Sequence, residues 1–430
     1  MEREYKVVEL FSGIGSQAKA LQNIGMKINV QGTCEWDYHA FVAYDAIHNS
    51  PELTPEVEAM TKAEVLEKLE GYTISSDGKT AMTFPILKTY TEDSLKRMYQ
   101  AIIRSHNYVD ITSLTGDKLP KNIDILTYSF PCQDLSNVGA FHGYNKGIDK
   151  DSGSRSSLLW QVGRILQEIK DGKRRLPRYL LMENVPTLLS KRHCGNFSMW
   201  KNDLEKLGYI NFHYEVNASS FGLPQNRPRL LMLSVFVGKN KKKRRKILEH
   251  FYNRPTSDDI VKDYVESDYY HNIQMRNLFR IDYSDKKLLD EAIECTPNDT
   301  PSRQKIWEEN PQLVLQNNVI NPAYDMIRTI TTKQDRNPNS GNIYINTGIP
   351  GKSHFRYLTP RECLLFMGFE DKDYDNIKKY NTEIHKGSDM FPRDKIIRMA
   401  GNSIPVKLLE GIFLQIKIID EQVFGDGCSQ

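Results

Sequence analysis

A chain of 430 residues with a formal charge of only +3 can hold a large α/β domain and a smaller one, and its composition excludes several classes of protein. Its six cysteines lie far apart, with no CxxC pair and no His/Cys cluster at metal-ligand spacing, which argues against a disulfide framework and predicts no metal site. The N-terminus lacks the apolar core of a signal peptide, and no run approaches the roughly 18 apolar residues of a membrane span. We therefore expect a cytoplasmic protein in a reducing compartment, without a membrane partner.

The chain opens with a predicted strand, a glycine turn and a helix. Residues 7–11 read VVELF, SGIG follows directly, and a helical pattern runs on to Ile24. A second strand ends in CEWD, so that Glu35 comes 22 residues after Gly13. This is close to the spacing at which an acid meets ribose hydroxyls in nucleotide-binding βαβ units. The pattern favours a nucleotide site, with an ordinary tight turn between strand and helix as the alternative.

Two later strands are predicted to end in reactive groups. After a polar insert at about 50–90, a helix near 91–105 and a third short segment closed by Asp110, the runs NIDILTYS and RYLLMEN are rich in β-formers. Cys132 follows the first run and Glu183 ends the second. Parallel strands of a doubly wound sheet end at one edge, so we expect the thiol, the carboxylate and the glycine turn to share a cleft.

Simple burial is the ordinary alternative for a cysteine outside a motif. It is disfavoured at Cys132 because Pro131 ends the strand and because polar residues follow in PCQDLS. The glycine-rich stretch 137–157 that comes next is typical of a functional lid, and a plain surface insert is its alternative.

The second half of the chain is less regular. FHYEVNA and RLLMLSVF, joined by SSFGLPQNRPR, predict a hairpin whose second strand receives Arg227 and Arg229. From about 239 to 328 prolines interrupt a polar, basic stretch, which predicts a separate small domain. Its run KNKKKRRK is either a solvated loop or a patch that contacts phosphates. Helical patterns return afterwards, with Thr359 and Ser403 as candidate N-caps.

Six blocks resemble the cytosine-C5 DNA methyltransferases in family order: FSGIG, PCQ, ENV, QNRPR, TPRECLLFMGF and GNSIPV. The resemblance implies an α/β fold with a doubly wound Rossmann-like sheet, the fold of S-adenosylmethionine-dependent methyltransferases, and a smaller irregular target-recognition domain. It implies a catalytic and cofactor-binding domain at 1–238, the recognition domain at 239–328, and a C-terminal segment at 329–430 whose last helix returns to the catalytic domain. Phe130 stands where many relatives carry a second proline, and the role of the 50–90 insert is left open.

The chemistry implied by this resemblance is sequence-specific methylation of a flipped-out cytosine in DNA. A thiolate at Cys132 would add to C6, so that C5 can attack the methyl group of the cofactor. Glu183 would bind the N3 and amino edge of the base. Arg229 would reach the base carbonyl and the thiol, and Arg227 would support the active site or contact a phosphate.

The cofactor implied is S-adenosyl-L-methionine, with Glu35 at the ribose and Trp36 on the adenine face. The cofactor-binding residues carried over are Phe11, Gly13, Gly15, Glu35, Trp36, Asp110, Ile111, Pro131, Asn402 and Ser403. The expected DNA-binding residues are Gln133, Ser136, Lys241, Lys242, Lys243, Arg244 and Arg245. We expect a stand-alone prokaryotic or phage enzyme that acts on duplex DNA as a monomer, which leaves a pairing with a restriction endonuclease open.

Three rival functions make different demands on the sequence. The RNA branch of the same family, which methylates tRNA, carries a Cys-Phe-Thr tripeptide that this chain lacks. A binding protein that has lost the reaction would not need Cys132, Glu183 and Arg229 together. A nicotinamide-dependent dehydrogenase needs a fuller glycine fingerprint than FSGIG and leaves PCQ and ENV unexplained.

Overall fold

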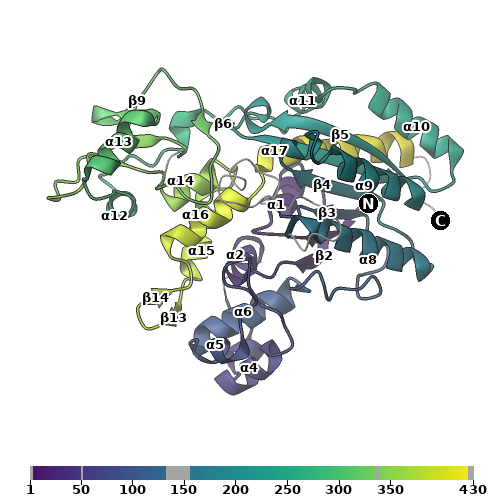
Figure 1. Ribbon diagram of the computed structural model, residues 1–430, viewed down its shortest axis with the longest axis horizontal. Coiled ribbons are helices and arrows are strands. Elements are labelled where there is room, and N and C mark those ends of the chain that lie inside the picture. The colour runs from purple at the N-terminus through teal and green to yellow at the C-terminus, as the bar shows by residue number, and fades with distance from the viewer. Residues whose placement is uncertain (1–2, 50–51, 132–154, 336–338, 425–430) are drawn as a thin grey trace.

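A six-stranded sheet organises the protein (Figure 1). The computed structural model describes residues 3–49, 52–131, 155–335 and 339–424. In sheet order the strands are β2 (Ile28–Cys34), β1 (Tyr5–Leu10), β3 (Ile125–Tyr128), β4 (Tyr179–Asn184), β7 (Pro228–Phe236) and β5 (Tyr209–Asn217). The first four are parallel, and β7 is antiparallel to both β4 and β5. The doubly wound α/β fold and the predicted hairpin are confirmed.

Both faces of the sheet are covered by helices, which explains why its central strands read as continuous apolar runs. Val7 and Leu181 pack on one face and Val8 and Leu180 on the other. The first face is covered by α1 (Ser16–Asn23), α2 (Tyr38–His48) and α17 (Val406–Ile419), and the second by α8 (Leu159–Asp171) and α9 (Cys194–Leu207). None of the described helices is long and apolar enough to cross a membrane.

A second, smaller unit lies beside the sheet at the left of Figure 1. Its four-stranded sheet has the order β12 (Phe355–Arg356), β11 (Asn342–Tyr344), β8 (Gln312–Leu315) and β9 (Val319–Ile320). It is accompanied by α12 (Lys286–Glu294) and α13 (Pro301–Glu309). Two short parallel strands, β6 (Gln225–Asn226) and β10 (Ile327–Arg328), pair where the chain passes between the units.

The stretch 239–328 is divided between the two units. Helix α10 (Lys241–Tyr252) lies against β5, and α11 (Ser257–Val265) lies against α17. The basic run is therefore the start of a helix and not a loop, with Asn240 as its N-cap. Its anchor is apolar, because Ile247 and Phe251 are buried and the Phe251 ring stacks on Phe212 with centroids 3.9 Å apart.

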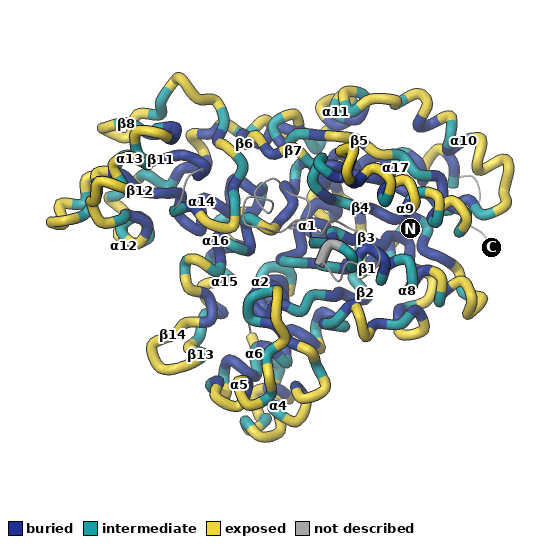
Figure 2. The backbone as a smooth tube through the Cα atoms, in the orientation of Figure 1, coloured by how far each residue is buried: buried dark blue, intermediate teal, exposed yellow. Residues whose placement is uncertain are grey.

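The 50–90 insert forms a third, mostly exposed lobe (Figure 2). It holds α3 (Pro55–Glu58), α4 (Lys62–Leu69) and α5 (Phe84–Lys88), and α3 and α4 pack on the predicted helix α6 (Glu92–Arg104). The hairpin β13 (Glu383–His385) and β14 (Ser388–Asp389) also contacts α6. The remaining helices are α14 (Pro360–Leu365), α15 (Asp371–Lys379) and α16 (Arg393–Asn402).

Two local predictions need correction. The segment closed by Asp110 is not a strand, since only an isolated bridge joins Asn107 to Thr33 of β2. Thr359 is confirmed as the N-cap of α14, where it forms a capping box with Glu362. Ser403 is no N-cap, because α17 begins after Pro405.

A carboxyl group inside the core ties β1 to two helices. Glu9 is fully buried and accepts hydrogen bonds from the backbone N–H of Ala18 at 3.0 Å and from the hydroxyl of Tyr44 at 2.5 Å. Burial raises the pKa of Glu9 to about 7, although both hydrogen bonds act in the opposite direction. The Glu9 carboxyl therefore keeps its proton at pH values well above those at which an ordinary glutamate loses it.

This pKa predicts a pH-dependent part of the stability. An unfolded glutamate releases its proton near about pH 4.3, whereas Glu9 in the folded protein keeps it until about pH 7. The contribution of Glu9 to the free energy of unfolding is therefore fully present below the unfolded pKa and is lost as pH rises through the folded pKa. Glu9→Gln should remove this loss, which urea unfolding between about pH 5 and about pH 8 would detect. An identical slope in the variant and the wild type would contradict the assignment.

Candidate active site

The glycine turn after β1 is open on one side and closed on the other. Phe11, Gly13 and Gly15 all have positive φ, at 58°, 53° and 80°. A Cβ at Gly15 would lie 2.2 Å from Nε2 of His48, so no larger residue fits there. A Cβ at Gly13 would meet nothing within 4 Å. The backbone at Gly13 therefore faces free space into which a ligand can come close.

Glu35 joins this turn to the loop after β2. Its Oε2 accepts a hydrogen bond from Gly13 N at 3.1 Å, and its Oε1 accepts one from Asp37 N at 2.9 Å. Burial raises the pKa of Glu35 to about 7, and the nearby charge of Asp37 adds to the rise. Trp36 follows, half-buried against the core. The predicted ribose and adenine residues thus border the open side of the glycine turn.

The segment at Asp110 is strained at the residue before it. Val109 has φ 62°, and Asp110 N donates to Tyr108 O at 2.8 Å, which together describe a rare γ-turn. A β-branched residue at positive φ is a true outlier, and such outliers cluster at ligand sites. Asp110 is half-buried, with its carboxylate accepting from Thr112, while Ile111 is buried.

A carboxylate and a guanidinium meet at the end of β4. Arg229 Nε lies 2.8 Å from Glu183 Oε1, and each side chain is only 12% exposed. Burial raises the pKa of Glu183, and the charges of Arg229 and Arg227 oppose that rise. The Glu183 carboxyl therefore lies close to a protein cation yet keeps a proton more readily than a surface glutamate.

The neighbouring Asn184 connects β4 to the chain that leaves β3. Its buried side-chain amide donates to Phe130 O at 3.1 Å. Pro131 comes next and is half-buried, whereas Cys132, Gln133, Ser136 and residues 137–154 of the predicted lid at 137–157 lie outside the described residues. The PCQ block therefore starts beside the Glu183–Arg229 pair.

Arg227 is an internal tie and not a phosphate ligand. Its guanidinium is 1% exposed and donates to Ile330 O at 2.7 Å and to Gly401 O and Ser403 O at 2.8 Å. A buried group with these carbonyl partners cannot reach a DNA backbone, which corrects that half of the prediction. It joins the start of β7 to α16, after which Ser403 Oγ lies 2.5 Å from Ser16 Oγ of α1. Asn402 is exposed beside this contact.

The basic start of α10 lies at the opposite end of the sheet. Lys243 Nζ lies 5.0 Å from the centroid of the Phe424 ring, which in turn packs edge-on against Tyr179. Tyr179 is the first residue of β4, whereas Glu183 is near its last. The predicted phosphate-contacting residues Lys241, Lys242, Lys243, Arg244 and Arg245 are therefore not beside the Glu183–Arg229 pair.

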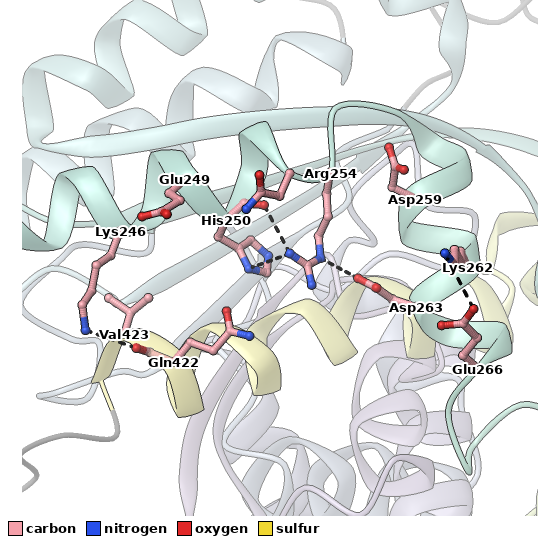
Figure 3. Close-up of a pocket in the computed structure, with 11 residues that line it drawn as sticks. Lys246, Glu249, His250, Arg254, Asp259, Lys262, Asp263, Glu266, Gln422 and Val423 are labelled. Carbon is pink, nitrogen blue, oxygen red and sulfur yellow. Dashed lines mark hydrogen bonds and ion pairs between the residues drawn. The ribbon is translucent and has the colours of Figure 1, made fainter.

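A polar cleft of about 630 Å³ lies on the same distant side, between α10, α11 and the C-terminal turn (Figure 3). Arg254 crosses it, 2.6 Å from Asp263 and next to His250. Lys246 reaches the carbonyl of Gln422. This cleft lies away from the carboxyl ends of the parallel strands, so it is separate from the site around Glu183 and Glu35.

Three residues around the site were not predicted to act there. Asn107 holds the backbone of Glu35 from both sides, through its side-chain oxygen at 3.0 Å and its nitrogen at 2.9 Å. Asn184 and Ser16 fix the contacts given above. Only Asn184 had a signal in the sequence, since it stands in the ENV block.

The two arginines of QNRPR should respond differently to replacement by lysine. Lysine cannot reproduce the planar fork of Arg227, so Arg227→Lys should lower the free energy of unfolding by roughly 3 kcal/mol. Arg229→Lys keeps a cation beside Glu183, so it should change stability by less than about 1 kcal/mol while reducing methyl transfer. Thermal unfolding and initial rates would test both. Equal losses of stability would contradict the distinction.

Comparisons with known proteins show the family of the chain. The profile of the C-5 cytosine-specific DNA methylase family matches residues 77–418. The orphan methyltransferase M.SssI of Spiroplasma monobiae is 32% identical over 421 residues, which cover 96% of this chain and 97% of that protein. The type II methyltransferase M2.ScrFI of Lactococcus lactis subsp. cremoris is 31% identical over 412 residues, covering 96% and 98%.

The fold is also that of solved methyltransferases. The crystal structure of the Dnmt2 methyltransferase of S. pombe superposes with a TM-score of 0.56 at 16% identity, covering 97% of this chain and 98% of that one. At such identity the likeness concerns the fold alone. The family match and the near full-length relatives go further: this chain belongs to the C-5 cytosine-specific DNA methylase family, and it transfers a methyl group from S-adenosylmethionine to cytosine in DNA.

Proposed function

We propose that the chain is a sequence-specific DNA (cytosine-5-)-methyltransferase that acts through covalent addition of Cys132 to C6 of a flipped-out cytosine. The observation that carries the proposal is the Glu183–Arg229 pair at 2.8 Å, joined to the start of PCQ by the bond from Asn184 to Phe130 O. This geometry brings an acid, a cation and the chain leading to a thiol to one edge of the sheet. A cytosine held there would be outside its duplex.

The role of Glu183 follows from its burial. Thiolate addition at C6 pushes electrons toward N3, which then needs a proton or a strong hydrogen bond. A carboxyl group whose pKa is raised by burial is protonated in a larger fraction of molecules and can supply that proton. Arg229, already held beside it, would turn toward the base carbonyl. Once C5 has accepted the methyl group, water would take the C5 proton and the Glu183 carboxylate would take back the N3 proton, so that the thiolate leaves and the ring is restored.

The described cysteines support Cys132 by exclusion. Burial raises the pKa of Cys34, Cys295 and Cys363, which makes these thiols poor nucleophiles at neutral pH. Cys194 is exposed, at the start of α9, and serves as a natural control. A nucleophile is therefore best sought in the PCQ block.

The turn and loops that border Gly13 fit the cofactor. S-Adenosylmethionine supplies an electrophilic methyl group on a sulfonium. We propose that Glu35 holds the ribose hydroxyls, that Trp36 lies on the adenine face, and that the backbone of Phe11, Gly13 and Gly15 lines the pocket. Asp110 and Ile111 would meet the adenine edge, and Pro131, Asn402 and Ser403 would close the pocket.

Recognition of sequence is proposed for the small unit with the sheet of β8, β9, β11 and β12. We expect a monomer in the cytoplasm that binds duplex DNA, with Gln133 and Ser136 near the backbone of the target strand. A partner endonuclease remains a prediction. Duplex DNA is favoured over RNA because the chain lacks the Cys-Phe-Thr tripeptide and matches DNA methylases over nearly its whole length.

Transfer of labelled methyl groups tests the function directly. Duplex DNA should be methylated at C5 of cytosine within one short sequence, and tRNA should not. Cys132→Ser should abolish transfer, because a hydroxyl is a far weaker nucleophile, while Cys194→Ser should remain active. A duplex with 5-fluorocytosine at the target should trap the wild type covalently. An adduct on Cys194, or turnover by the Cys132 variant, would overturn the mechanism.

The position of α10 yields a separate prediction about DNA contacts. Because Lys241 to Arg245 lie near the amino end of β4, we expect that replacing all five with glutamine leaves the KM for a short duplex and its salt dependence unchanged. Arg328 is an exposed cation on β10, where it pairs in register with Asn226, three residues before Arg229. Arg328→Gln should reduce the salt slope by about one phosphate contact. A reversed pattern would assign the DNA path to α10.

A further inference from the structure

The exposed insert reaches the proposed cofactor pocket through one tight turn. Ser75 N donates to Trp36 O at 2.7 Å, and Tyr38 N donates to Ser75 O at 3.0 Å, so that the insert pairs with the chain on both sides of Asp37. Ser75 is fully buried. The turn itself is stiffened by Asp77, whose carboxylate accepts from two of the backbone N–H groups that follow it, at 2.7 and 2.9 Å.

An ion pair closes the same point from a third element. Arg398 of α16 lies 2.5 Å from Asp37, and the two side chains are 19% and 11% exposed. Its guanidinium also approaches Ser76 O at 3.5 Å, and Lys395 Nζ donates to the same carbonyl at 2.8 Å. The insert, the loop after β2 and α16 are thus joined around one carboxylate.

This junction is linked to Glu35 by a short path. The backbone N–H of Asp37 binds one oxygen of Glu35, and Gly13 N–H binds the other. A displacement of Asp37 therefore acts directly on the carboxylate proposed to hold the ribose. Trp36 is constrained as well, because its carbonyl is the acceptor for Ser75.

The charge of the insert argues against a direct role in binding DNA. Between residues 52 and 90 it carries seven acidic and four basic side chains. An excess of negative charge repels the phosphate backbone, so this lobe is a poor candidate for a DNA-binding arm. The contacts that the insert makes with residues 36–38 therefore call for another function.

We propose that the turn at residues 74–81 and the Arg398–Asp37 ion pair position Glu35 and Trp36, and so set the affinity for S-adenosylmethionine. Arg398 is then a positioning residue, because it acts through Asp37 and does not touch the cofactor. The inference rests on the proposed function, since it takes Glu35 and Trp36 as cofactor-binding residues.

The test compares cofactor affinity with turnover. Arg398→Met and Asp37→Asn should each weaken binding of S-adenosylhomocysteine by about tenfold in calorimetry, the loss expected for one charge-assisted interaction. KM for S-adenosylmethionine should rise to the same extent, while kcat at saturating cofactor and KM for DNA stay within about twofold. Arg398→Lys should recover part of the affinity. In the double variant the losses should be less than additive, because both changes remove one contact.

Arg104→Met is the matched control. Arg104 ends α6, the helix on which the insert packs, is 17% exposed, forms an ion pair with Asp45 at 3.2 Å, and also donates to the Tyr380 hydroxyl and the Glu52 carbonyl. It should lower the melting temperature and leave cofactor affinity unchanged. Wild-type affinity in Arg398→Met, or an equal loss in Arg104→Met, would overturn the proposal. If Arg398→Met does not fold, the affinities of Arg398→Lys and Asp37→Asn for S-adenosylhomocysteine test the proposal, and wild-type affinity in both would overturn it.

Glu35→Gln separates this inference from the function on which it rests. If Glu35→Gln binds the cofactor as the wild type does, the proposed cofactor site itself is wrong. If Glu35→Gln weakens binding while Arg398→Met and Asp37→Asn do not, the site stands and only the positioning role fails.

Discussion

The direction of the strands is the constraint on which the site depends. β1, β2, β3 and β4 are parallel, so the glycine turn, Glu35, Phe130 and Glu183 all follow strands that end at one edge of the sheet. Because β7 runs the other way, it begins at this edge, and Arg229 near its start meets Glu183 near the end of β4. Reversing β7 would carry Arg229 to the far edge. One antiparallel strand therefore supplies the cation that a purely parallel sheet could not.

Polar ties then hold the loops that leave these strands. Arg227 donates to three carbonyl groups from two distant segments, and Asn107 fixes the backbone at Glu35. Each tie uses a side chain whose donors match fixed carbonyl or amide partners, which costs less desolvation than an isolated charge would. Burial raises the pKa of three carboxyl groups, Glu9, Glu35 and Glu183, and each of them has a hydrogen-bond or ion-pair partner.

The sequence predicted the parts of the fold that rest on local pattern. Alternating and continuous apolar runs marked β1 to β4 and the β5–β7 hairpin, and Thr359 was recognisable as a cap by its own neighbours. The sequence did not predict helix α10, because its first turn is wholly basic whereas a helix N-terminus favours acidic residues. The Asn240 cap and the packing of Phe251 on Phe212 offset that disadvantage, and such packing is not visible in one sequence.

The site was predictable to the extent that its residues stand at strand ends. Glu183 and Glu35 lie at strand ends, and the predicted parallel order of the strands placed both residues at one edge of the sheet. The γ-turn at Val109 could not be predicted, because valine disfavours a positive φ and its surroundings impose it. Nor could the partners of Arg227 and Asp37 be read in advance, since they lie more than a hundred residues away in the chain.

The contact between Ser16 and Ser403 spans 387 residues, and that between Arg3 and Asp420 spans 417. Helix α1 packs against α17, so the first βα unit meets this partner only after α17 has been synthesised. A ribosome adding about 5–20 residues per second needs on the order of half a minute to travel from one serine to the other. Throughout that time the face of α1 that packs on α17 is uncovered. A nascent chain therefore completes this packing only after α17 has left the ribosome.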